Sequence, residues 1–406
     1  MCVLWLTAIQ RLTVGVLGAD NKMRILFDAI SITKRKAGVG VYAKNLLESL
    51  LAHKELNFTV LAQDDDPDFD YRDRPNVTML WVPSRFLRAR PIRMIYEQTV
   101  LPFLLWKHRI DLIHSLHYSF PLFSLRSKKV VTIHDMTSYS MPEVHLAVKR
   151  FYHRFFIRAA SRAADGLIFV SQSALNDFLQ RFGRPKGFTA VVYHGKTEAL
   201  GPCSGNADKI QQVRAKYSLP PRFVLYIGMI EPRKNLARLV EAFSRVAECQ
   251  PDVVLVLAGM KGWMYEEIFA RIKTLNLESR VLFPGFVAED DKRFVLCAAE
   301  LFIYPSFYEG FGLPVLEALA CGVPTITSNT SSLPEVAGGA ALMVEPTSTE
   351  EISHALEQLL TDVALRQQLR EASIRQASLF TWQKTAAGTV RMYRGVFGGR
   401  GLANPA

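Results

Sequence analysis

Short apolar runs rich in β-branched residues alternate with longer amphipathic stretches along almost the whole chain. In the first half these runs lie at 24–28, 58–61, 77–81, 111–114, 130–133, 166–170 and 190–193. In the second half they lie at 223–227, 253–258, 281–283, 301–304, 323–327 and 341–344. Continuous apolar strands separated by helices are typical of parallel sheets covered on both faces. Two such series predict an α/β protein with two facing, Rossmann-like doubly wound domains and a cleft between them.

The domain boundaries follow from turn-forming residues. Gly, Pro and Ser gather at 201–205, and Pro220-Pro221 precedes a new strand. We therefore predict a first domain over 23–200, a linker over 201–222 and a second domain over 223–379. Residues 380–397 have apolar positions at helical spacing, and we expect a closing helix there.

The first 22 residues do not fit the first domain. The apolar run 3–19 is interrupted by Arg11, and no basic region precedes it. It is too short and too broken for a good spanning helix and makes a poor signal peptide. We interpret 1–22 as an upstream extension, with Met23 as the natural start. No later segment reaches 18 uninterrupted apolar residues, so we predict no transmembrane helix.

Composition narrows the class of protein. Of the 406 residues, 49% are hydrophobic and 21% are charged, which excludes a disordered or fibrous chain. The formal net charge of +11 favours anionic partners, namely nucleic acid, phosphate-bearing substrates or acidic lipid headgroups. The charge alone does not distinguish them.

The five cysteines are scattered and form no CxxC pair: Cys2, Cys203, Cys249, Cys297 and Cys321. This spacing argues against a disulfide framework and against a zinc site. It fits a reducing compartment, so we expect a cytoplasmic protein.

The segment 306–317, SFYEGFGLPVLE, carries the clearest chemistry. It follows a predicted strand, and Pro314 suits the first turn of a helix. A tight loop at a helix N-terminus presents backbone amides to an anion, so Gly310, Phe311 and Gly312 are predicted to hold a diphosphate. Glu309 and Glu317 frame this loop and are suited to accept hydrogen bonds from sugar or ribose hydroxyls. The alternative is a plain turn followed by a solvated helix.

A second candidate site follows the strand 223–227 and reads GMIEPRKN. Gly228 permits a sharp turn, and Arg233 and Lys234 stand where a helix begins. Cations at the carboxyl edge of a sheet would neutralise a leaving diphosphate as charge develops on it. A pair of solvated loop charges is the alternative interpretation.

Together these segments resemble the large retaining glycosyltransferase family 4, also called group 1, which has the GT-B fold. The resemblance covers almost the whole chain from Met23. It rests on 38–42 (GVGVY), 132–135 (TIHD), 170–173 (VSQS), 231–235 (EPRKN), 284–286 (PGF), 309–317 and 380–382 (FTW). It implies a final helix that packs back on the first domain.

The resemblance also implies roles for individual residues. Glu309 is expected to contact the donor sugar, Glu317 the nucleotide ribose, and Lys234 the diphosphate. Many members carry Arg directly after Gly228, whereas this chain has Met229, and we expect Arg233 to substitute. The donor-binding set that we predict is Gly38, Gly40, Gly228, Arg233, Lys234, Gly285, Phe286, Glu309, Gly310, Phe311, Gly312, Leu313 and Glu317.

The first domain supplies candidates for the acceptor side. The run 36–42 opens a helical pattern over 43–50. It lacks the third glycine of a dinucleotide fingerprint, which weakens an NAD interpretation. By resemblance, Gly38 and Gly40 reach towards the donor phosphate, while Tyr42, His134 and Asp135 line the acceptor side. His117 is our candidate to face the reacting sugar and completes a catalytic set with Glu309, Lys234 and Arg233. Each histidine also has an ordinary interpretation as a satisfied loop residue.

Four arginines, each four residues apart, form a basic ridge on a predicted helix: Arg150, Arg154, Arg158 and Arg162. Like charges at this spacing repel, so the ridge costs stability unless an anion lies against it. The ridge is either a solvated helix face or a docking surface for an anionic membrane. No nucleic-acid-binding module accompanies it, and we expect no nucleic acid partner.

These features predict a retaining hexosyltransferase that needs no cofactor and no divalent metal. The acidic run 64–66 lacks a framing strand, and we interpret it as a solvated loop. Residues 27–29 (FDA), together with 38–42, resemble bacterial mannosyl- and rhamnosyltransferases of lipopolysaccharide or capsule synthesis. GDP-mannose is therefore the first donor candidate, before GDP-rhamnose, UDP-sugars and dTDP-sugars, and the acceptor is expected to be a saccharide, free or linked to polyprenyl diphosphate. The alternatives are a nucleotide-sugar epimerase and a non-catalytic sugar-nucleotide-binding protein.

Overall fold

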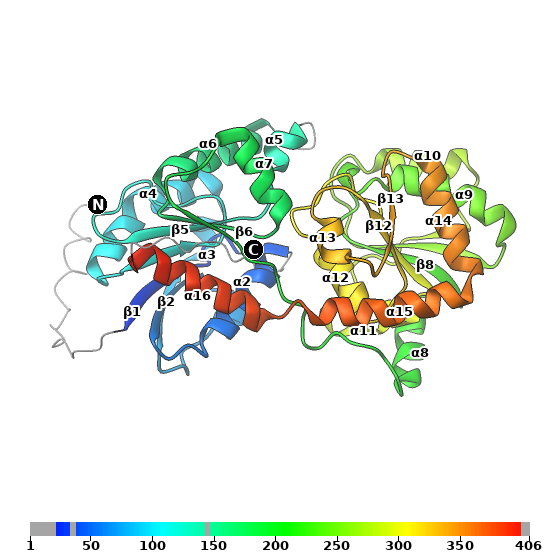
Figure 1. Ribbon diagram of the computed structural model, residues 1–406, viewed down its shortest axis with the longest axis horizontal. Helices are drawn as coiled ribbons and strands as arrows, with labels where there is room; N and C mark the ends of the chain where they lie inside the picture. Colours follow the sequence, from blue (N-terminus) through cyan, green and yellow to red (C-terminus); the bar gives the residue numbers. More distant parts are fainter. Residues whose placement is uncertain (1–21, 33–37, 143–146, 399–406) are drawn as a thin grey trace.

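The computed structural model describes residues 22–32, 38–142 and 147–398 (Figure 1). Residues 1–21 of the upstream extension, which include Cys2, and part of the run 36–42 lie outside these ranges. Within them the chain forms two α/β units that lie side by side, each built on one parallel sheet. None of the helices in these ranges is long and apolar enough to cross a bilayer.

The first sheet has seven parallel strands in the order β3-β2-β1-β4-β5-β6-β7. The strands are β1 (Met23–Asp28), β2 (Leu56–Gln63), β3 (Val77–Val82), β4 (Leu112–Ser115), β5 (Lys128–Ile133), β6 (Gly166–Phe169) and β7 (Phe188–Val191). The helices are α2 (Gly38–Leu50), η1 (Pro67–Phe69), α3 (Ser84–Leu87), α4 (Arg90–Lys107), α5 (Thr137–Ser140), α6 (Ala147–Ala163) and α7 (Gln172–Phe182). The central strands β1, β4, β5 and β6 are almost entirely buried, as their apolar runs predict.

The second sheet has six parallel strands in the order β10-β9-β8-β11-β12-β13. The strands are β8 (Arg222–Ile227), β9 (Val253–Ala258), β10 (Val281–Leu282), β11 (Leu301–Tyr304), β12 (Thr325–Ser328) and β13 (Leu342–Val344). The helices are α8 (Ala207–Lys216), η3 (Pro232–Lys234), α9 (Leu236–Cys249), α10 (Glu266–Thr274), α11 (Glu289–Ala298), α12 (Leu313–Ala320), α13 (Leu333–Ala337), α14 (Thr349–Thr361) and α15 (Val363–Ser378). In both sheets the chain starts in the middle and then crosses to the other side, which creates a switch point at the carboxyl edge.

The predicted fold class, two Rossmann-like doubly wound domains, is confirmed. Every predicted strand is present, with ends shifted by a few residues at most. One helix differs: α2 already includes residues 38–42, whereas the helical pattern was expected over 43–50. Gly38, Gly40 and Tyr42 therefore lie within a helix rather than in the loop before it.

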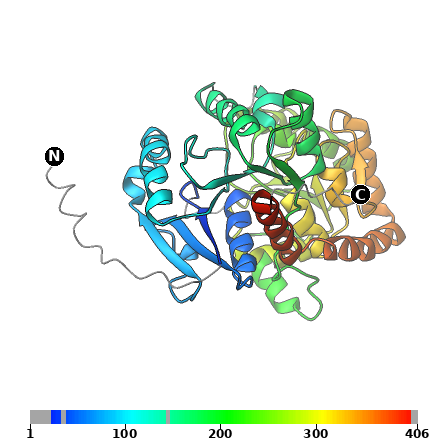
Figure 2. The ribbon, with the colours of Figure 1, turned by 60° about the vertical axis from the view of Figure 1, so that its left-hand side comes forward.

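The closing helix α16 (Trp382–Gly398) returns to the first domain, as expected, and lies beside α2 (Figure 2). A side chain on Gly166 of β6 would meet Met392 and Val396, so this glycine lets α16 pack directly on the sheet. The Tyr393 hydroxyl hydrogen-bonds to Nδ1 of His114 at 2.7 Å. His114 is thereby a satisfied core histidine that anchors α16.

Two segments join the domains, and they run next to each other. One follows β7 and the other precedes α16. The Lys196 amide donates to the Phe380 carbonyl at 3.1 Å, and the Thr385 hydroxyl donates to the Tyr193 carbonyl at 2.7 Å. A Cβ on Gly195 would lie 2.2 Å from the backbone nitrogen of Trp382, so only glycine allows this approach.

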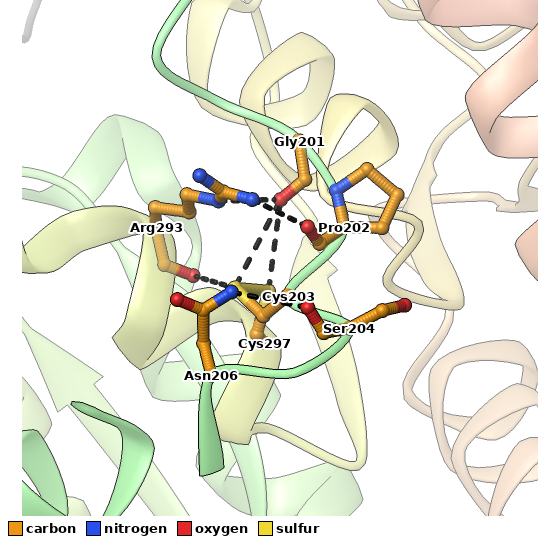
Figure 3. The surroundings of a disulfide bond; sticks show 7 residues. All are labelled: Gly201, Pro202, Cys203, Ser204, Asn206, Arg293 and Cys297. Carbon is orange, nitrogen blue, oxygen red and sulfur yellow. Dashed lines mark hydrogen bonds between the residues drawn. A yellow bond between two sulfur atoms is a disulfide. The ribbon is translucent and has the colours of Figure 1, made fainter. Parts of the chain in front are cut away.

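The expectation of unpaired cysteines is wrong for one pair. Cys203 of the linker and Cys297 of α11 form a disulfide, with Cα atoms 6.1 Å apart (Figure 3). Arg293 of the same helix donates from Nε to the Gly201 carbonyl at 2.9 Å, which holds the linker on α11. The sequence carries no spacing signal for a pair 94 residues apart, because tertiary folding alone brings the linker against this helix. Cys249 and Cys321 are free thiols.

Candidate active site

The glycine loop of the second domain lies between β11 and α12, at the carboxyl edge of the sheet. Gly312 caps α12 with a φ of +101°, a conformation that favours glycine, and Pro314 lies in the first turn. The predicted loop at a helix N-terminus is therefore present. Its amides and the α12 dipole face the end of the strand, where an anion would be stabilised.

The loop after β8 brings two cations to the same edge. Asn235 adopts the left-handed conformation (φ +60°). Its side-chain Nδ2 donates to the carbonyls of Pro305 and Pro346 at 3.1 and 2.6 Å. This ties the short helix η3 to the segment after β11. Arg233 and Lys234 are consequently held beside Glu309, which lies 75 residues further along the chain.

Glu309 forms ion pairs with both cations. Its Oε1 lies 2.6 Å from Nζ of Lys234, and its Oε2 lies 2.9 Å from a guanidinium nitrogen of Arg233. The same guanidinium also donates to the Tyr308 carbonyl at 2.7 Å and pairs with Glu231 at 2.8 Å. Lys234 and Glu309 are both buried, so their charges interact with little screening by water.

The pKa values of these groups reflect burial and mutual pairing. Burial lowers the pKa of Lys234, helped by the adjacent Arg233 and opposed by Glu309. Burial acts to raise the pKa of Glu309, but Arg233 and Lys234 outweigh it and hold the pKa below its ordinary value. The carboxylate of Glu309 is therefore ionised at neutral pH. Together with Glu231 it pairs with the two cations that the cluster would offer to a diphosphate.

Two tyrosines that sequence reasoning missed support Lys234. The Tyr304 hydroxyl accepts a hydrogen bond from Lys234 Nζ at 2.6 Å, and its ring stacks on Tyr226 with centroids 5.5 Å apart. The Tyr226 hydroxyl donates to the Met229 carbonyl at 2.9 Å, so the loop after β8 is tied to its own strand. Both tyrosines belong to strands, β8 and β11, whose sequences are typical of buried strands. Their hydroxyl groups therefore gave no sign of a functional contact in the sequence.

Glu317 lies one turn inside α12, as predicted, but it is not a solvated helix residue. It is 6% exposed and its Oε1 accepts from Lys292 of α11 at 3.0 Å. Lys292 also donates to Glu289 at 2.8 Å. Burial opposes the charged form of Lys292, yet Glu317 and Glu289 together raise its pKa. Lys292 was not a sequence candidate, because its contact with Glu317 depends on how α11 packs on α12.

The first domain meets the glycine loop directly. A Cβ on Gly310 would lie only 1.8 Å from the His134 carbonyl oxygen and 2.9 Å from Cβ of Asp135. The Ser171 hydroxyl donates to the Gly310 carbonyl at 2.7 Å. Arg233 helps to lower the pKa of Asp135 against burial, together with hydrogen bonds from Thr137. The structure thus brings the predicted acceptor-side pair together with the predicted diphosphate loop.

Two further contacts join the domains beside this junction. The Tyr308 hydroxyl donates to Asp177 of α7 at 2.6 Å. The carboxylate of Glu335 in α13 accepts hydrogen bonds from the Gln172 and Ser173 amides, both at 2.7 Å. A carboxylate at a helix N-terminus satisfies unpaired amides and favours the helix dipole. Glu335 therefore binds the start of α7 across the domain junction.

The histidine candidates differ in their surroundings. His117 is half-buried, with its ring 4.7 Å from Tyr118 and 5.5 Å from His153. Burial and the neighbouring His153 lower its pKa well below the ordinary value, which keeps it neutral. His134 is buried, and its Nε2 is hydrogen-bonded to the Leu116 carbonyl at 2.8 Å.

Tyr42, predicted on the acceptor side, is fully buried. Its hydroxyl bonds to Thr132 at 3.1 Å and its ring packs on His134 and His194. The side chain belongs to the packing between α2 and α16, so its position supports a structural contribution. Gly38 at the start of α2 has open space where a Cβ would stand.

Three other predicted donor-side positions, Gly228, Gly285 and Phe286, lie in the segments that follow β8 and β10. The Gly228 carbonyl lies 1.8 Å from where a Cβ on Gly259 would stand, so the ends of β8 and β9 approach closely. Gly285 has a φ of +79° and its carbonyl accepts from the Gly259 amide at 2.8 Å. Phe286 next to it is 63% exposed.

The arginine ridge on α6 is only partly free. Arg150 donates to the Pro142 carbonyl at 3.2 Å. Arg154 donates to the Ser138 carbonyl at 2.7 Å and lies over the Tyr139 ring. Arg158 and Arg162 are exposed. Half of the predicted ridge therefore binds the protein's own backbone, which offsets the repulsion between like charges. Among the described residues, no group of three or more His, Cys, Asp or Glu side chains is placed to hold a metal ion.

Comparison with known families agrees with this arrangement. Residues 37–196 match the model of glycosyltransferase family 4, and residues 208–376 match the model of the glycosyl transferases group 1. The two models follow one another along the chain and cover both sheets.

Among characterised proteins, the chain is 27% identical over 383 residues to O-antigen chain mannosyltransferase B from Escherichia coli, covering 92% of this chain and 100% of the relative. It is 33% identical over 279 residues to the serotype-specific mannosyltransferase WbdA from Escherichia coli, covering 67% of this chain. That match spans about a third (34%) of the length of WbdA.

Solved structures share the fold over nearly the whole chain. Sucrose-phosphate synthase from Thermosynechococcus elongatus superposes with a TM-score of 0.73 at 22% identity, covering 93% of this chain and 100% of that one. HepE from Anabaena, in complex with UDP and glucose, gives a TM-score of 0.72 at 21% identity, with 92% and 100% covered. With both halves matched in order and the fold shared throughout, the chain belongs to glycosyltransferase family 4, the group 1 glycosyltransferases, and is a glycosyltransferase with the GT-B fold.

Proposed function

We propose that this glycosyltransferase transfers mannose from GDP-mannose, with retention of configuration and without a metal ion, to a saccharide acceptor of bacterial O-antigen or related surface polysaccharide. The cluster of Arg233, Lys234 and Glu309 carries the proposal, because it lies against the first domain at the junction of His134 and Gly310. Relatives named as mannosyltransferases support the choice of sugar.

In the proposed reaction, the bond between the anomeric carbon and the diphosphate oxygen breaks while the acceptor oxygen bonds to the same carbon from the same face. The acceptor proton passes to the departing diphosphate. Arg233 and Lys234 stabilise the negative charge that develops on the leaving group, which is the main catalytic device. The α12 N-terminus adds its dipole, and Glu309 accepts hydrogen bonds from the donor sugar.

The Glu317–Lys292 pair is proposed to hold the nucleotide. A carboxylate fixed by a lysine presents its second oxygen in a constant orientation, which suits the two hydroxyls of a ribose. His117, neutral and half-buried at the acceptor edge, is proposed to face the reacting sugar.

We also propose that the enzyme works in the cytoplasm at the inner face of the membrane, where a polyprenyl-diphosphate-linked acceptor would lie. The outer face of α4 carries a stripe of exposed apolar side chains at helical spacing: Ile92, Ile95, Phe103 and Trp106. An exposed apolar stripe with nearby cations is typical of a surface that binds an anionic membrane. Arg158 and Arg162, the exposed members of the ridge on α6, are proposed to contribute positive charge to such a surface.

The enzymatic proposal is tested by thermal unfolding with GDP, UDP, dTDP or ADP, each with and without EDTA. Ligand stabilisation grows with the ratio of ligand concentration to Kd, so the preferred nucleotide gives the largest shift. A GDP-selective shift that EDTA leaves unchanged and Lys234→Ala abolishes is expected, followed by release of GDP from GDP-mannose in the presence of acceptor. A UDP- or dTDP-selective shift would overturn the donor. Flotation with phosphatidylglycerol vesicles, comparing wild type with Ile95→Ser/Trp106→Ser, tests the membrane surface.

A further inference from the structure

A second cluster of charged side chains is buried in the first domain, at the carboxyl ends of β1 and β4. Asp28 is the last residue of β1, and His117 follows β4 by two residues. Arg93 and Glu97 reach the same place from α4, one helical turn apart. Asp28 is 5% exposed and Glu97 is 1% exposed. Burying charged groups costs free energy, so a buried cluster of this kind needs partners that compensate for the loss of water.

The contacts inside the cluster do not satisfy it. The nearer oxygen of Glu97 accepts from the Ser119 hydroxyl at 3.2 Å and lies 3.5 Å from Nε of Arg93. Burial, with Asp28 nearby, raises the pKa of Glu97 to about 8, and burial raises that of Asp28 to about 6. Tyr152 of α6 lies next to the cluster: its hydroxyl is near Ser119 and Arg93, and the charge of Glu97, after burial, raises its pKa.

Four polar atoms of the cluster are fully buried and make no hydrogen bond of good geometry within residues 22–32, 38–142 and 147–398: Nε of Arg93, Oε2 of Glu97, Nδ1 of His117 and the hydroxyl of Tyr152. Of these, Nε of Arg93 has Glu97 beside it, and the Tyr152 hydroxyl has Ser119 and Arg93 beside it. A buried polar atom that stays unpaired destabilises the fold. Native proteins rarely leave several of them together, so water or a ligand is expected to complete the set.

The cluster is continuous with the domain junction. His117 packs on Tyr118, and the Tyr118 hydroxyl donates to the Asp135 carbonyl at 3.3 Å. Asp135 in turn lies beside Gly310 of the diphosphate loop. The unpaired atoms therefore extend from the junction into the first domain, away from the donor side.

We propose that Arg93, Glu97, His117 and Tyr152 form the subsite that binds hydroxyl groups of the acceptor sugar. This inference rests on the proposed function, since it assigns the acceptor side of the same active site. Each hydroxyl both donates and accepts, so a neutral sugar ring can satisfy a guanidinium, a carboxyl group and a phenol that lie side by side.

The charges favour a neutral sugar over the phosphate of a lipid-linked acceptor. A phosphate would gain from Arg93 but would bring negative charge next to Asp28 and Glu97, whose pKa values show that this place already disfavours negative charge. Anion sites in proteins are built from donors, whereas this cluster mixes donors and acceptors. A sugar that inserts its hydroxyls here would leave any phosphate or lipid part outside the cluster.

The test measures binding of methyl α-mannoside, methyl α-glucoside, methyl β-galactoside and inorganic phosphate by saturation-transfer NMR, with GDP present. Glu97→Met removes both oxygens at similar volume, and Tyr152→Phe removes only the hydroxyl. Glu55→Gln, which alters an exposed ion pair with Arg394, is the matched control. Thermal unfolding confirms folding, and the GDP-induced shift reports the donor site separately.

Wild type and Glu55→Gln are expected to bind at least one glycoside equally well. Glu97→Met should weaken that binding about tenfold or more, and Tyr152→Phe about threefold or more, with the GDP shift unchanged. The proposal is overturned if wild type binds no glycoside, if both variants bind as wild type does, or if phosphate displaces the glycoside and is itself lost in the variants. If Glu97→Met does not fold, Tyr152→Phe decides alone. A missing GDP shift in wild type would instead count against the proposed donor.

Discussion

The His134 carbonyl oxygen lies 1.8 Å from the point where a Cβ on Gly310 would stand, so the two domains touch at a place where no side chain fits. This contact joins the predicted acceptor side to the predicted diphosphate loop. This contact sets the shortest possible distance between the two domains, because the backbones at His134 and Gly310 cannot approach each other further.

Gly310→Ala is expected to push the domains apart at this contact. A displacement of about 1 Å between reactive groups can cost about a hundredfold in rate, so kcat/KM should fall by about that factor. Donor binding, measured by the nucleotide shift, should change little. Gly339→Ala is the control, because a Cβ there meets open space. Unchanged kcat/KM in Gly310→Ala would show that the domains move apart freely during turnover.

Glu309→Gln removes the anion that Lys234 and Arg233 share. Breaking a buried ion pair leaves an uncompensated charge, so the free energy of unfolding should fall by about 3–5 kcal/mol. GDP should then raise the Tm more than in wild type, because its diphosphate replaces the lost anion. Glu300→Gln breaks pairs with Arg222 and Arg366 outside the site and should leave the GDP shift as it is. Equal GDP shifts in Glu309→Gln and wild type would contradict this.

The same pair predicts a pH dependence. The pKa of Glu309 in the folded protein is below its ordinary value of 4.5, because Arg233 and Lys234 outweigh the effect of burial. As the pH falls, the unfolded chain therefore takes up this proton first and the folded state loses stability. The stabilisation is complete above about pH 5 and is lost as the pH falls through the folded pKa. The Tm difference between wild type and Glu309→Gln should narrow from pH 7 to pH 3; a constant difference would rule out this titration.

Glu335→Gln should weaken the attachment of α13 to the start of α7. A carboxylate at a helix N-terminus that also accepts two charge-assisted bonds contributes about 1–2 kcal/mol. The scattering-derived radius of gyration of the ligand-free variant should increase, and kcat should fall about two- to tenfold. Glu350→Gln, on an exposed pair with Arg245, serves for comparison. A variant as compact and active as wild type would show that other contacts hold the domains.

Reduction of the Cys203–Cys297 disulfide should lower stability and leave the active site intact. Closing a loop of 94 residues stabilises a fold by up to about 4–5 kcal/mol. Dithiothreitol should therefore lower the Tm of wild type but not that of Cys203→Ser, whereas Cys249→Ser should respond as wild type does. Thiol labelling in cells addresses the compartment, because a cytoplasmic enzyme would hold both thiols reduced.

The features that could be predicted from the sequence are those that a few neighbouring residues determine. Apolar runs located all the strands, and Gly312 with Pro314 located the start of α12, since each signal is confined to a few neighbouring residues. The contact of Lys292 with Glu317 and the contact of Glu335 with α7 could not be predicted from the sequence, because each depends on how separate elements pack. The helical conformation of residues 38–42 in α2 was missed for a different reason: two glycines opposed a helix that tertiary packing imposes.

The paired connections between the domains restrict how this enzyme can open. The Lys196 amide and the Phe380 carbonyl join the two crossing segments by a hydrogen bond, so we expect the segments to bend together as one hinge rather than as two independent tethers. Rotation about that hinge would separate the far edge of the cleft while the near edge stays closed. Substrates would then enter from the side where Glu335 meets α7, and each catalytic cycle would break and remake that contact. Lengthening one crossing segment alone would let the two segments bend independently. The domains would then close in a less reproducible orientation.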